Sequence, residues 1–328
     1  KISNILEIPF ITGFCFWNNI LQDGFSNINI LNNNHLHKDD LFHEITEHSY
    51  SYASSQFVND VIYKFFNKKI DVIETISLKD DYYVQNTEDY YVTLLNCHFN
   101  KGGFLLEKLI QELNINIPLF LVYTEFDDQL NLNTIQKLID QRNSKKNINI
   151  LFTEKQEIKE IYKKTKIILI PSLCDETFCR VGYEAKMNNI LIISTDSGNL
   201  KYLLKDYAFF LKNDVNLWIN NIEKLYFEKN IKKITQQTNI IHTYESELKN
   251  NIKNIFINHS KSKYKLNDKH VGLIVPWADQ GLGIQSRSYY HSLKNIGFNP
   301  FIFSFKPYHG NDENNYLQHD PNEWKLEN

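Results

Sequence analysis

The sequence is poor in cysteine, in long apolar runs and in excess charge of one sign, and each shortage excludes a class of protein. It holds four cysteines in 328 residues, which excludes a disulfide scaffold and predicts a reducing compartment, here the cytoplasm. No apolar run reaches the ~18 residues of a membrane span, so we expect no transmembrane segment. With 36 basic and 39 acidic residues the net charge is −3, whereas a dedicated nucleic-acid binder would show a basic stripe.

Methionine is almost absent as well. Met187 is the only one, and the chain begins with Lys1. We therefore expect a piece of a longer product, whose N-terminal targeting signal would not be visible in this sequence. The composition itself is that of a folded protein: hydrophobic residues make up 42% and aromatic residues 14%. A chain of this length is typical of about two domains.

Residues 1–82 form the first predicted domain. Apolar runs indicate strands at 8–16 and 69–76. Between them, Ser54 and Ser55 precede apolar residues at helical spacing, which predicts a helix behind a serine cap.

Residues 83–214 form the second predicted domain, in which strands and helices alternate. Short apolar runs predict strands at 91–97, 118–123, 148–152, 167–171, 190–194 and 207–211. Amphipathic periodicity predicts helices at 105–113, 134–141, 157–164, 178–187 and 200–204. This alternation predicts an α/β fold with a parallel, doubly wound sheet.

The rest of the chain divides into a helical segment with a polar linker, residues 215–262, and a fresh unit, residues 263–328. The fresh unit is predicted to contain, in order, a strand at 270–276, a glycine loop at 279–283, a helix at 286–296, a strand at 300–305 and a polar tail.

The most informative stretch is 167–200, where a predicted strand, a loop with Glu176, a helix with Glu184 and a second loop follow one another. Open α/β sheets bind ligands at the carboxyl ends of their strands, where these loops would lie. The start of the helix at 178 would offer backbone N–H groups to a phosphate. Alternatively, both glutamates merely interact with the helix dipole and solvent.

This stretch resembles the donor-binding half of the GT-B glycosyltransferases, in particular the retaining nucleotide-sugar-dependent group (glycosyltransferase family 4, glycosyl transferases group 1). The resemblance is carried by Pro171-Ser172, Glu176-Thr177-Phe178-Cys179, Glu184-Ala185 and Ser197-Gly198-Asn199. It implies a GT-B-like fold with doubly wound, Rossmann-like domains facing a cleft. Residues 1–82 would be the incomplete N-terminal, acceptor-side domain and residues 83–214 the donor-binding domain.

A second motif of that family lies upstream, at Lys101-Gly102. The resemblance implies that Lys101 contacts the donor diphosphate, that Glu176 lies by the donor sugar, and that Glu184 holds the ribose hydroxyls. Lys101 and Glu176 are therefore the expected catalytic residues. The further donor-binding residues implied are Phe178, Ser197, Gly198, Asn199, Leu200, Arg180 and Gly102. Arg180 either adds charge near the phosphates or lies on the helix surface.

The sequence also departs from the family pattern. Asn96 replaces an arginine that often precedes the lysine, and Cys179 and Asn189 replace glycines, although Asn189 suits a left-handed helix cap. Asn199 and Tyr202 replace a glycine and an acidic residue.

The glycine loop near the C-terminus resembles the opening of a GT-B N-terminal domain. The residues that carry this resemblance are Gly281, Gly283 and Arg287. Either a second transferase begins at residue 263, in a tandem chain, or residues 263–328 are a permuted part of the first domain.

No metal site is expected. The histidines at 35, 37, 43 and 48 do not have the spacing of a zinc motif, and Cys174 and Cys179 lack a second cysteine pair. A solvated loop and buried thiols are the better interpretations.

The resemblance as a whole implies a hexosyltransferase-like enzyme. It would move a sugar from a UDP- or GDP-sugar co-substrate to an unknown glycan, lipid or protein acceptor, with retention and with no bound cofactor or metal. The alternative is an inactive nucleotide-sugar-binding or scaffold domain.

Overall fold

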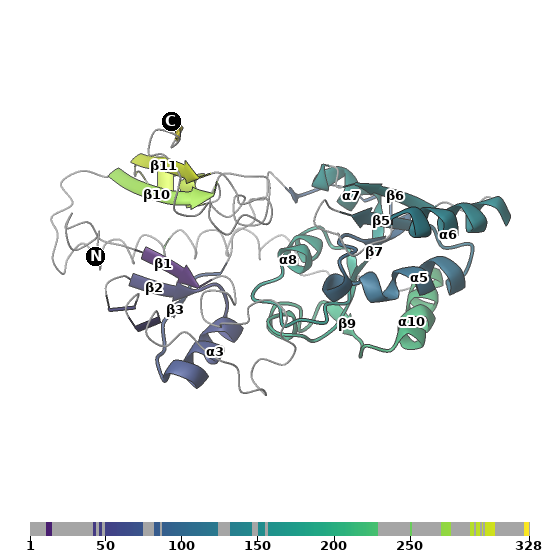
Figure 1. Ribbon diagram of the computed structural model, residues 1–328, viewed down its shortest axis with the longest axis horizontal. Coiled ribbons are helices and arrows are strands. Elements are labelled where there is room, and N and C mark those ends of the chain that lie inside the picture. The colour runs from purple at the N-terminus through teal and green to yellow at the C-terminus, as the bar shows by residue number, and fades with distance from the viewer. Residues whose placement is uncertain are drawn as a thin grey trace.

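The computed structural model describes residues 11–14, 42–43, 46–47, 50–74, 82–85, 87–123, 132–145, 150–154, 157–228, 250, 270–276, 289–291, 293–295, 297, 299–305 and 325–327. These residues form one six-stranded sheet and two three-stranded sheets. Figure 1 shows the six-stranded sheet with its helices on one side of the molecule and the two smaller sheets on the other. The α/β class predicted from the sequence is confirmed.

The six-stranded sheet is parallel throughout and doubly wound. Its strands, in chain order, are β4 (Tyr91–Leu94), β5 (Leu119–Tyr123), β6 (Ile150–Glu154), β7 (Thr165–Ile170), β8 (Leu191–Ser194) and β9 (Ala208–Phe210). Their order in space is β6-β5-β4-β7-β8-β9. The chain therefore starts at the centre with β4, winds outward to β6, returns to the centre with β7 and winds outward again. The point between β4 and β7, where the winding reverses, is the topological switch point.

Helices cover both faces of this sheet. They are α5 (Gly103–Glu112), α6 (Leu132–Lys145), α7 (Ile158–Lys164), α8 (Arg180–Met187), α9 (Leu200–Leu203) and α10 (Val215–Phe227). Strand β7 alternates between the two faces: Ile167 and Leu169 join the core under α5, α6 and α10, whereas Ile168 and Ile170 join the core with α7, α8 and α9. A sheet buried on both faces needs such continuous apolar runs.

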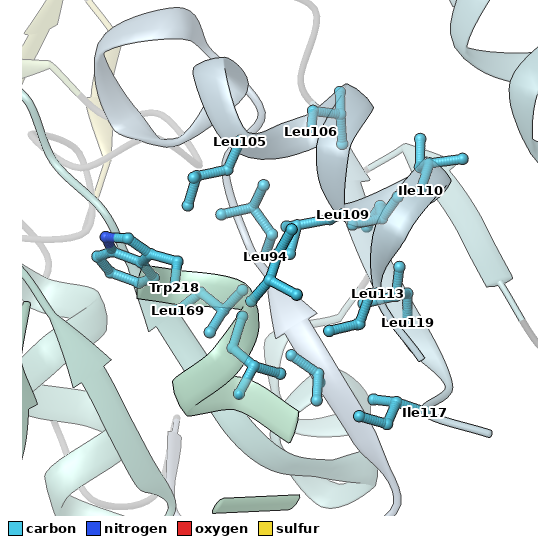
Figure 2. Packing of buried hydrophobic residues seen from close by; sticks show 14 of the residues in the cluster. Leu94, Leu105, Leu106, Leu109, Ile110, Leu113, Ile117, Leu119, Leu169 and Trp218 are labelled. Atoms are coloured by element: carbon cyan, nitrogen blue, oxygen red, sulfur yellow. The ribbon is translucent and has the colours of Figure 1, made fainter. Parts of the chain in front are cut away.

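The larger core lies between α5, α10 and the central strands. Figure 2 shows Leu105 and Leu109 of α5 pointing toward Leu94 of β4, with Trp218 of α10 beside them. The Trp218 side chain is fully buried, and its indole N–H donates to the carbonyl oxygen of Lys212 over 2.9 Å. Trp218 therefore belongs to this core.

The first small sheet has the order β1-β2-β3, with β1 (Ile11–Phe14), β2 (Tyr50–Ala53) and β3 (Asp71–Val72), all parallel. Helix α3 (Gln56–Phe66) follows β2, and the Ser55 side chain accepts from the backbone N–H of Val58 as its N-cap. The serine-capped helix was predicted. Strand β2 was not predicted, and β3 is shorter than the predicted strand.

The second small sheet has the order β10-β11-β12, with β10 (His270–Pro276), β11 (Asn299–Phe305) and β12 (Lys325–Glu327). β10 and β11 are parallel, and β12 pairs antiparallel to β11. The sequence predicted β10 and β11 but no strand in the tail. The Tyr52 hydroxyl donates to the Tyr289 hydroxyl over 2.7 Å, which joins the helical turn at 289–291 to β2.

Helix α8 begins at Arg180 rather than at the predicted residue 178, because Cys179 has a left-handed backbone conformation and acts as its N-cap. Among the described helices, none has both the length and the apolar character needed to cross a membrane.

Truncation of Trp218 tests the core. We expect Trp218→Ala to lower the free energy of unfolding by about 3–5 kcal/mol, because it removes a large, fully buried side chain. Leu217→Ala is the matched control on the same helix, since Leu217 is exposed, and it should change stability by less than about 0.5 kcal/mol. Urea unfolding followed by circular dichroism measures both. Equal losses in the two variants would contradict this packing.

Candidate functional site

The candidate site begins where β4 and β7 end. These two strands are neighbours in the sheet, and the loop after β4 carries Lys101 whereas the loop after β7 carries Glu176. Carboxyl strand ends at a switch point are where open α/β sheets bind ligands. The fold therefore brings together two residues that are far apart in the sequence.

A tight turn after β4 presents Lys101. The 3-10 helix η4 (Phe99–Lys101) is followed by Gly102 with φ 141°. A Cβ atom at Gly102 would lie 2.6 Å from Leu94 Cδ1 and 2.9 Å from Pro171 Cγ. Glycine is therefore required here both by the positive φ and by the close approach of the two loops.

Lys101 and Glu176 form an ion pair. Lys101 Nζ lies 2.5 Å from Glu176 Oε1, and the Ser172 hydroxyl donates to the same oxygen over 2.5 Å. The Lys101 side chain is 26% exposed and that of Glu176 is 10% exposed. Burial alone would lower the pKa of the Lys101 ammonium group, but the adjacent Glu176 carboxylate raises this pKa above its ordinary value. The lysine is therefore charged at neutral pH.

The loop after β8 closes on Glu176 from the other side. Glu176 and Gly198 form an isolated parallel β-bridge, and the backbone N–H of Asn199 donates to the Glu176 carbonyl oxygen over 2.8 Å. The Ser197 hydroxyl donates to the Ser172 carbonyl oxygen over 3.0 Å. These bonds hold the loops after β7 and β8 together, so the predicted donor-binding residues Ser197, Gly198 and Asn199 do lie beside Glu176.

Two residues at family glycine positions adopt the left-handed conformation that favours glycine. Cys179 has φ 70° and Asn189 has φ 56°. The prediction that Asn189 takes a left-handed cap conformation is confirmed. The side-chain amide of Asn199, at a third glycine position, donates to the Phe178 carbonyl oxygen over 3.1 Å.

Phe178 and Leu200, which were predicted to bind the donor, are buried in the core with α8 and α9. Their backbone atoms lie in the same loops as Glu176 and Gly198. Any contribution of these two residues to a ligand would therefore come from the backbone, and their roles stay predictions.

Glu184 lies in a second, buried cluster on α8. One carboxylate oxygen accepts from the Arg180 guanidinium over 2.7 Å, and the other accepts from the Tyr162 hydroxyl over 2.6 Å. Arg180 also donates to the Tyr82 hydroxyl over 2.7 Å. Burial, followed by the Glu184 charge, raises the pKa of the Tyr162 hydroxyl well above its usual value, so Tyr162 remains a hydrogen-bond donor.

Arg180 does not extend from the helix surface into solvent, since its side chain is only 18% exposed. Burial would lower its pKa, and the Glu184 charge raises it above the ordinary value. Arg180 is therefore partly buried beside Glu184, and both alternatives for its role stay predictions.

Residues 1–82 also contact residues 83–214 at this end of the sheet. The Ser55 hydroxyl, at the start of α3, donates to the Thr177 carbonyl oxygen over 2.5 Å. The Tyr202 hydroxyl donates to Asp60 over 3.3 Å, and the Tyr202 ring lies 6.4 Å from that of Phe57. Tyr202, which stands where the family has an acidic residue, thus reaches toward α3.

The two cysteines near the site, Cys174 and Cys179, form no disulfide. Burial, with a further contribution from nearby carboxylates, raises the pKa of both Cys174 and Cys179. Within the part of the chain that the structure describes, no group of three or more histidine, cysteine, aspartate or glutamate side chains could hold a metal ion.

Several predicted residues lie outside the described part of the chain. They are Gly281, Gly283, Arg287 and the histidines at 35, 37 and 48. Sequence reasoning gave no role to Ser172 and Tyr162. Ser172 follows the strand-terminal proline of the motif, which is a usable signal, whereas Tyr162 has no local signal.

Gly198→Ala tests the close approach of the loops. Gly198 has φ 60°, and a Cβ atom there would lie 2.4 Å from the Glu176 backbone nitrogen. We expect a loss of about 2–4 kcal/mol in unfolding free energy, from backbone strain and overpacking. Gly182→Ala is the control, because its Cβ would first meet a flexible Leu204 methyl at 3.2 Å, and it should change stability by less than about 1 kcal/mol. Similar thermal unfolding of the two variants would refute this loop geometry.

Comparisons with known proteins agree with this architecture. HepE from Anabaena in complex with UDP is similar to this chain with a TM-score of 0.61, at 14% identity, over 78% of this chain and 74% of its own. HepE with UDP and glucose gives a TM-score of 0.59, at 14% identity, over 78% of this chain and 73% of its own. The sucrose-phosphate synthase of Thermosynechococcus elongatus gives a TM-score of 0.48, at 15% identity, over 63% of this chain and 58% of its own, and this weaker likeness carries no argument.

No curated protein gives a significant sequence match to the chain. A family model, described as glycosyl transferases group 1, matches residues 79–255, more than half of the chain. This region contains the six-stranded sheet, the ion pair of Lys101 and Glu176, and helix α8. The likeness to HepE shows the fold. The chain belongs to the glycosyl transferases group 1 family and has a GT-B-like α/β fold.

Proposed function

We propose that the protein transfers a sugar from a nucleotide diphosphate sugar, a UDP- or GDP-sugar, to an acceptor. One observation carries this proposal: Lys101, Glu176 and Ser172 meet at the switch point of a parallel sheet in a chain of this family. The solved complexes of HepE with UDP, and with UDP and glucose, support a nucleotide-sugar donor.

In this proposal, Lys101 binds the donor diphosphate. An ammonium group donates up to three hydrogen bonds, so the bond to Glu176 leaves donors for a phosphate. Negative charge on the diphosphate grows as the bond to the sugar breaks, and a fixed cation there stabilises the transition state. The start of α8 adds to this, because the first backbone N–H groups of a helix favour an anion.

The carboxylates and glycine loops position the rest of the donor. Glu176 accepts hydrogen bonds from the sugar hydroxyls, with the backbone of Ser197 to Leu200 beside it, and Gly102 keeps the β4 loop close. Glu184 holds the ribose. Charged hydrogen bonds of this kind contribute roughly 1.5–3 kcal/mol each.

The finer parts of the proposal are a hexosyl group as the transferred sugar, retention at its anomeric carbon, and a glycan, lipid or protein as acceptor. We also propose residues 83–214 as the donor-binding domain and residues 1–82 as acceptor-side. The bond between Tyr52 and Tyr289 supports the alternative in which residues 263–328 pack with the first domain.

A second candidate function is binding of nucleotide sugars without turnover. It is favoured by the departures from the family pattern at Asn96, Cys179, Asn189 and Asn199. Turnover of the donor distinguishes the two functions.

The experiment incubates the full chain with a panel of UDP- and GDP-sugars and measures release of the nucleotide. We expect slow hydrolysis of one donor. Lys101→Ala should reduce its rate about 10²- to 10³-fold, because the developing diphosphate charge loses its cation, and Glu176→Ala should abolish hydrolysis. Lys108→Ala is the matched control. Lys108 is an exposed lysine of α5 that pairs with Glu112 on the same helix, so this variant should hydrolyse the donor at the wild-type rate.

Donor binding without release of nucleotide would favour the second candidate. Equal rates in Lys101→Ala and Lys108→Ala would contradict the proposed role of Lys101.

Chelation tests the metal independence that we propose. If Lys101 and the start of α8 neutralise the diphosphate, hydrolysis should continue unchanged in excess EDTA. The measurement is nucleotide release before and after dialysis against the chelator. A loss of activity that Mg²⁺ or Mn²⁺ restores would show that a metal ion supplies this charge.

A further inference from the structure

Helix α8 presents three polar side chains one turn apart, Arg180, Glu184 and Asn188. Arg180 and Glu184 pair with each other. Asn188 donates to the carbonyl oxygens of Glu184 and Tyr82, each over 2.9 Å, and accepts from the backbone N–H of Val84 over 2.7 Å. This face of α8 is therefore bound to the segment that enters the six-stranded sheet.

The Glu184 carboxylate is fixed through both of its oxygens. Arg180 holds one oxygen from the preceding turn of α8, and Tyr162 holds the other from α7. Two anchors on different oxygens define the plane of the carboxylate as well as its position. Tyr162 is itself fully buried, so this anchor has little freedom to move.

Burial makes this arrangement necessary. A carboxylate that is 3% exposed is costly unless it is paired and hydrogen-bonded. Arg180 is the cation that pairs with it. The Arg180 guanidinium is in turn held by Tyr82, whose hydroxyl accepts from it over 2.7 Å and whose ring centroid lies 5.1 Å away.

We propose that Arg180 is a positioning residue, which holds the Glu184 carboxylate correctly oriented for the two ribose hydroxyls of the donor nucleotide. This inference rests on the proposed function, in which Glu184 binds the ribose. It assigns Arg180 a role that acts through Glu184 rather than through the phosphates.

The rival role is a direct contact of Arg180 with the diphosphate. Within the described residues, the buried Nε atom of Arg180 has no hydrogen-bond partner, so a direct contact is a definite alternative. The two roles differ in the part of the nucleotide whose binding depends on Arg180. A positioning role requires the ribose hydroxyls, whereas a phosphate contact does not.

The experiment measures binding of UDP, GDP and their 2′,3′-dideoxy analogues to the full chain by calorimetry. We expect Arg180→Ala to weaken binding of the preferred nucleotide about tenfold or more, the effect of one charged hydrogen bond, and to leave binding of its dideoxy analogue unchanged. Arg180→Lys should restore part of the affinity, because the cation remains. Lys186→Ala is the control on the same helix, since its ammonium group points to the Leu203 carbonyl oxygen, and it should bind both ligands as the wild type does.

A double variant keeps the test valid if Arg180→Ala alone does not fold, because Glu184→Gln removes the charge that would be left unpaired. We expect Arg180→Ala/Glu184→Gln to bind UDP or GDP no more weakly than Glu184→Gln alone. A further loss in the double variant, or an equal loss for the dideoxy nucleotide, would overturn the positioning role in favour of a phosphate contact. Binding of neither UDP nor GDP by the wild-type protein would contradict the proposed function itself, and this inference with it.

Discussion

The ion pair of Lys101 and Glu176 joins two loops whose residues are 75 positions apart, and the rest of the site is arranged around it. It exists because β4 and β7 are parallel neighbours whose carboxyl ends share an edge. Gly102 lets the β4 loop pass Pro171, and Gly198 lets the β8 loop pass the Glu176 backbone. Charges that are partly removed from water are stable only when paired, so without a ligand each of these two side chains is the partner of the other.

Most of the six-stranded sheet could be predicted because its strands are apolar runs separated by amphipathic helices. The missed strands lack that signal. β2 has the sequence YSYA, directly before the serine cap of α3, and contains no aliphatic run. β12 is the three-residue strand KLE, which exists through its pairing with β11. In both, tertiary context decides the conformation rather than local propensity.

The residues of the candidate site likewise fall into those that the sequence identifies and those that it does not. Lys101, Glu176 and the Ser197–Asn199 loop could be identified because short motifs carry them, and the parallel sheet then explains why they meet. The direction of Arg180 could not be identified, since a spacing of four residues to Glu184 suits an exposed helix pair as well as a buried one. Only the burial of Glu184, and the tyrosine that α7 places opposite it, distinguish the two. Tyr162 itself has the local pattern of an ordinary core tyrosine.

The replaced glycines bear more on stability than on the placement of the site. Cys179 and Asn189 keep the positive φ angles that glycine would adopt, at a cost of about 1–2 kcal/mol for a residue with a Cβ atom, and less for asparagine. The backbone therefore follows the glycine path on entering and leaving α8, and the loop before Cys179 still sets Glu176 against Lys101. The loops around the ion pair therefore keep their course in spite of this strain. For this reason the lost glycines are weak evidence for an inactive domain. Whether the protein turns over a donor depends instead on the charged side chains of the site.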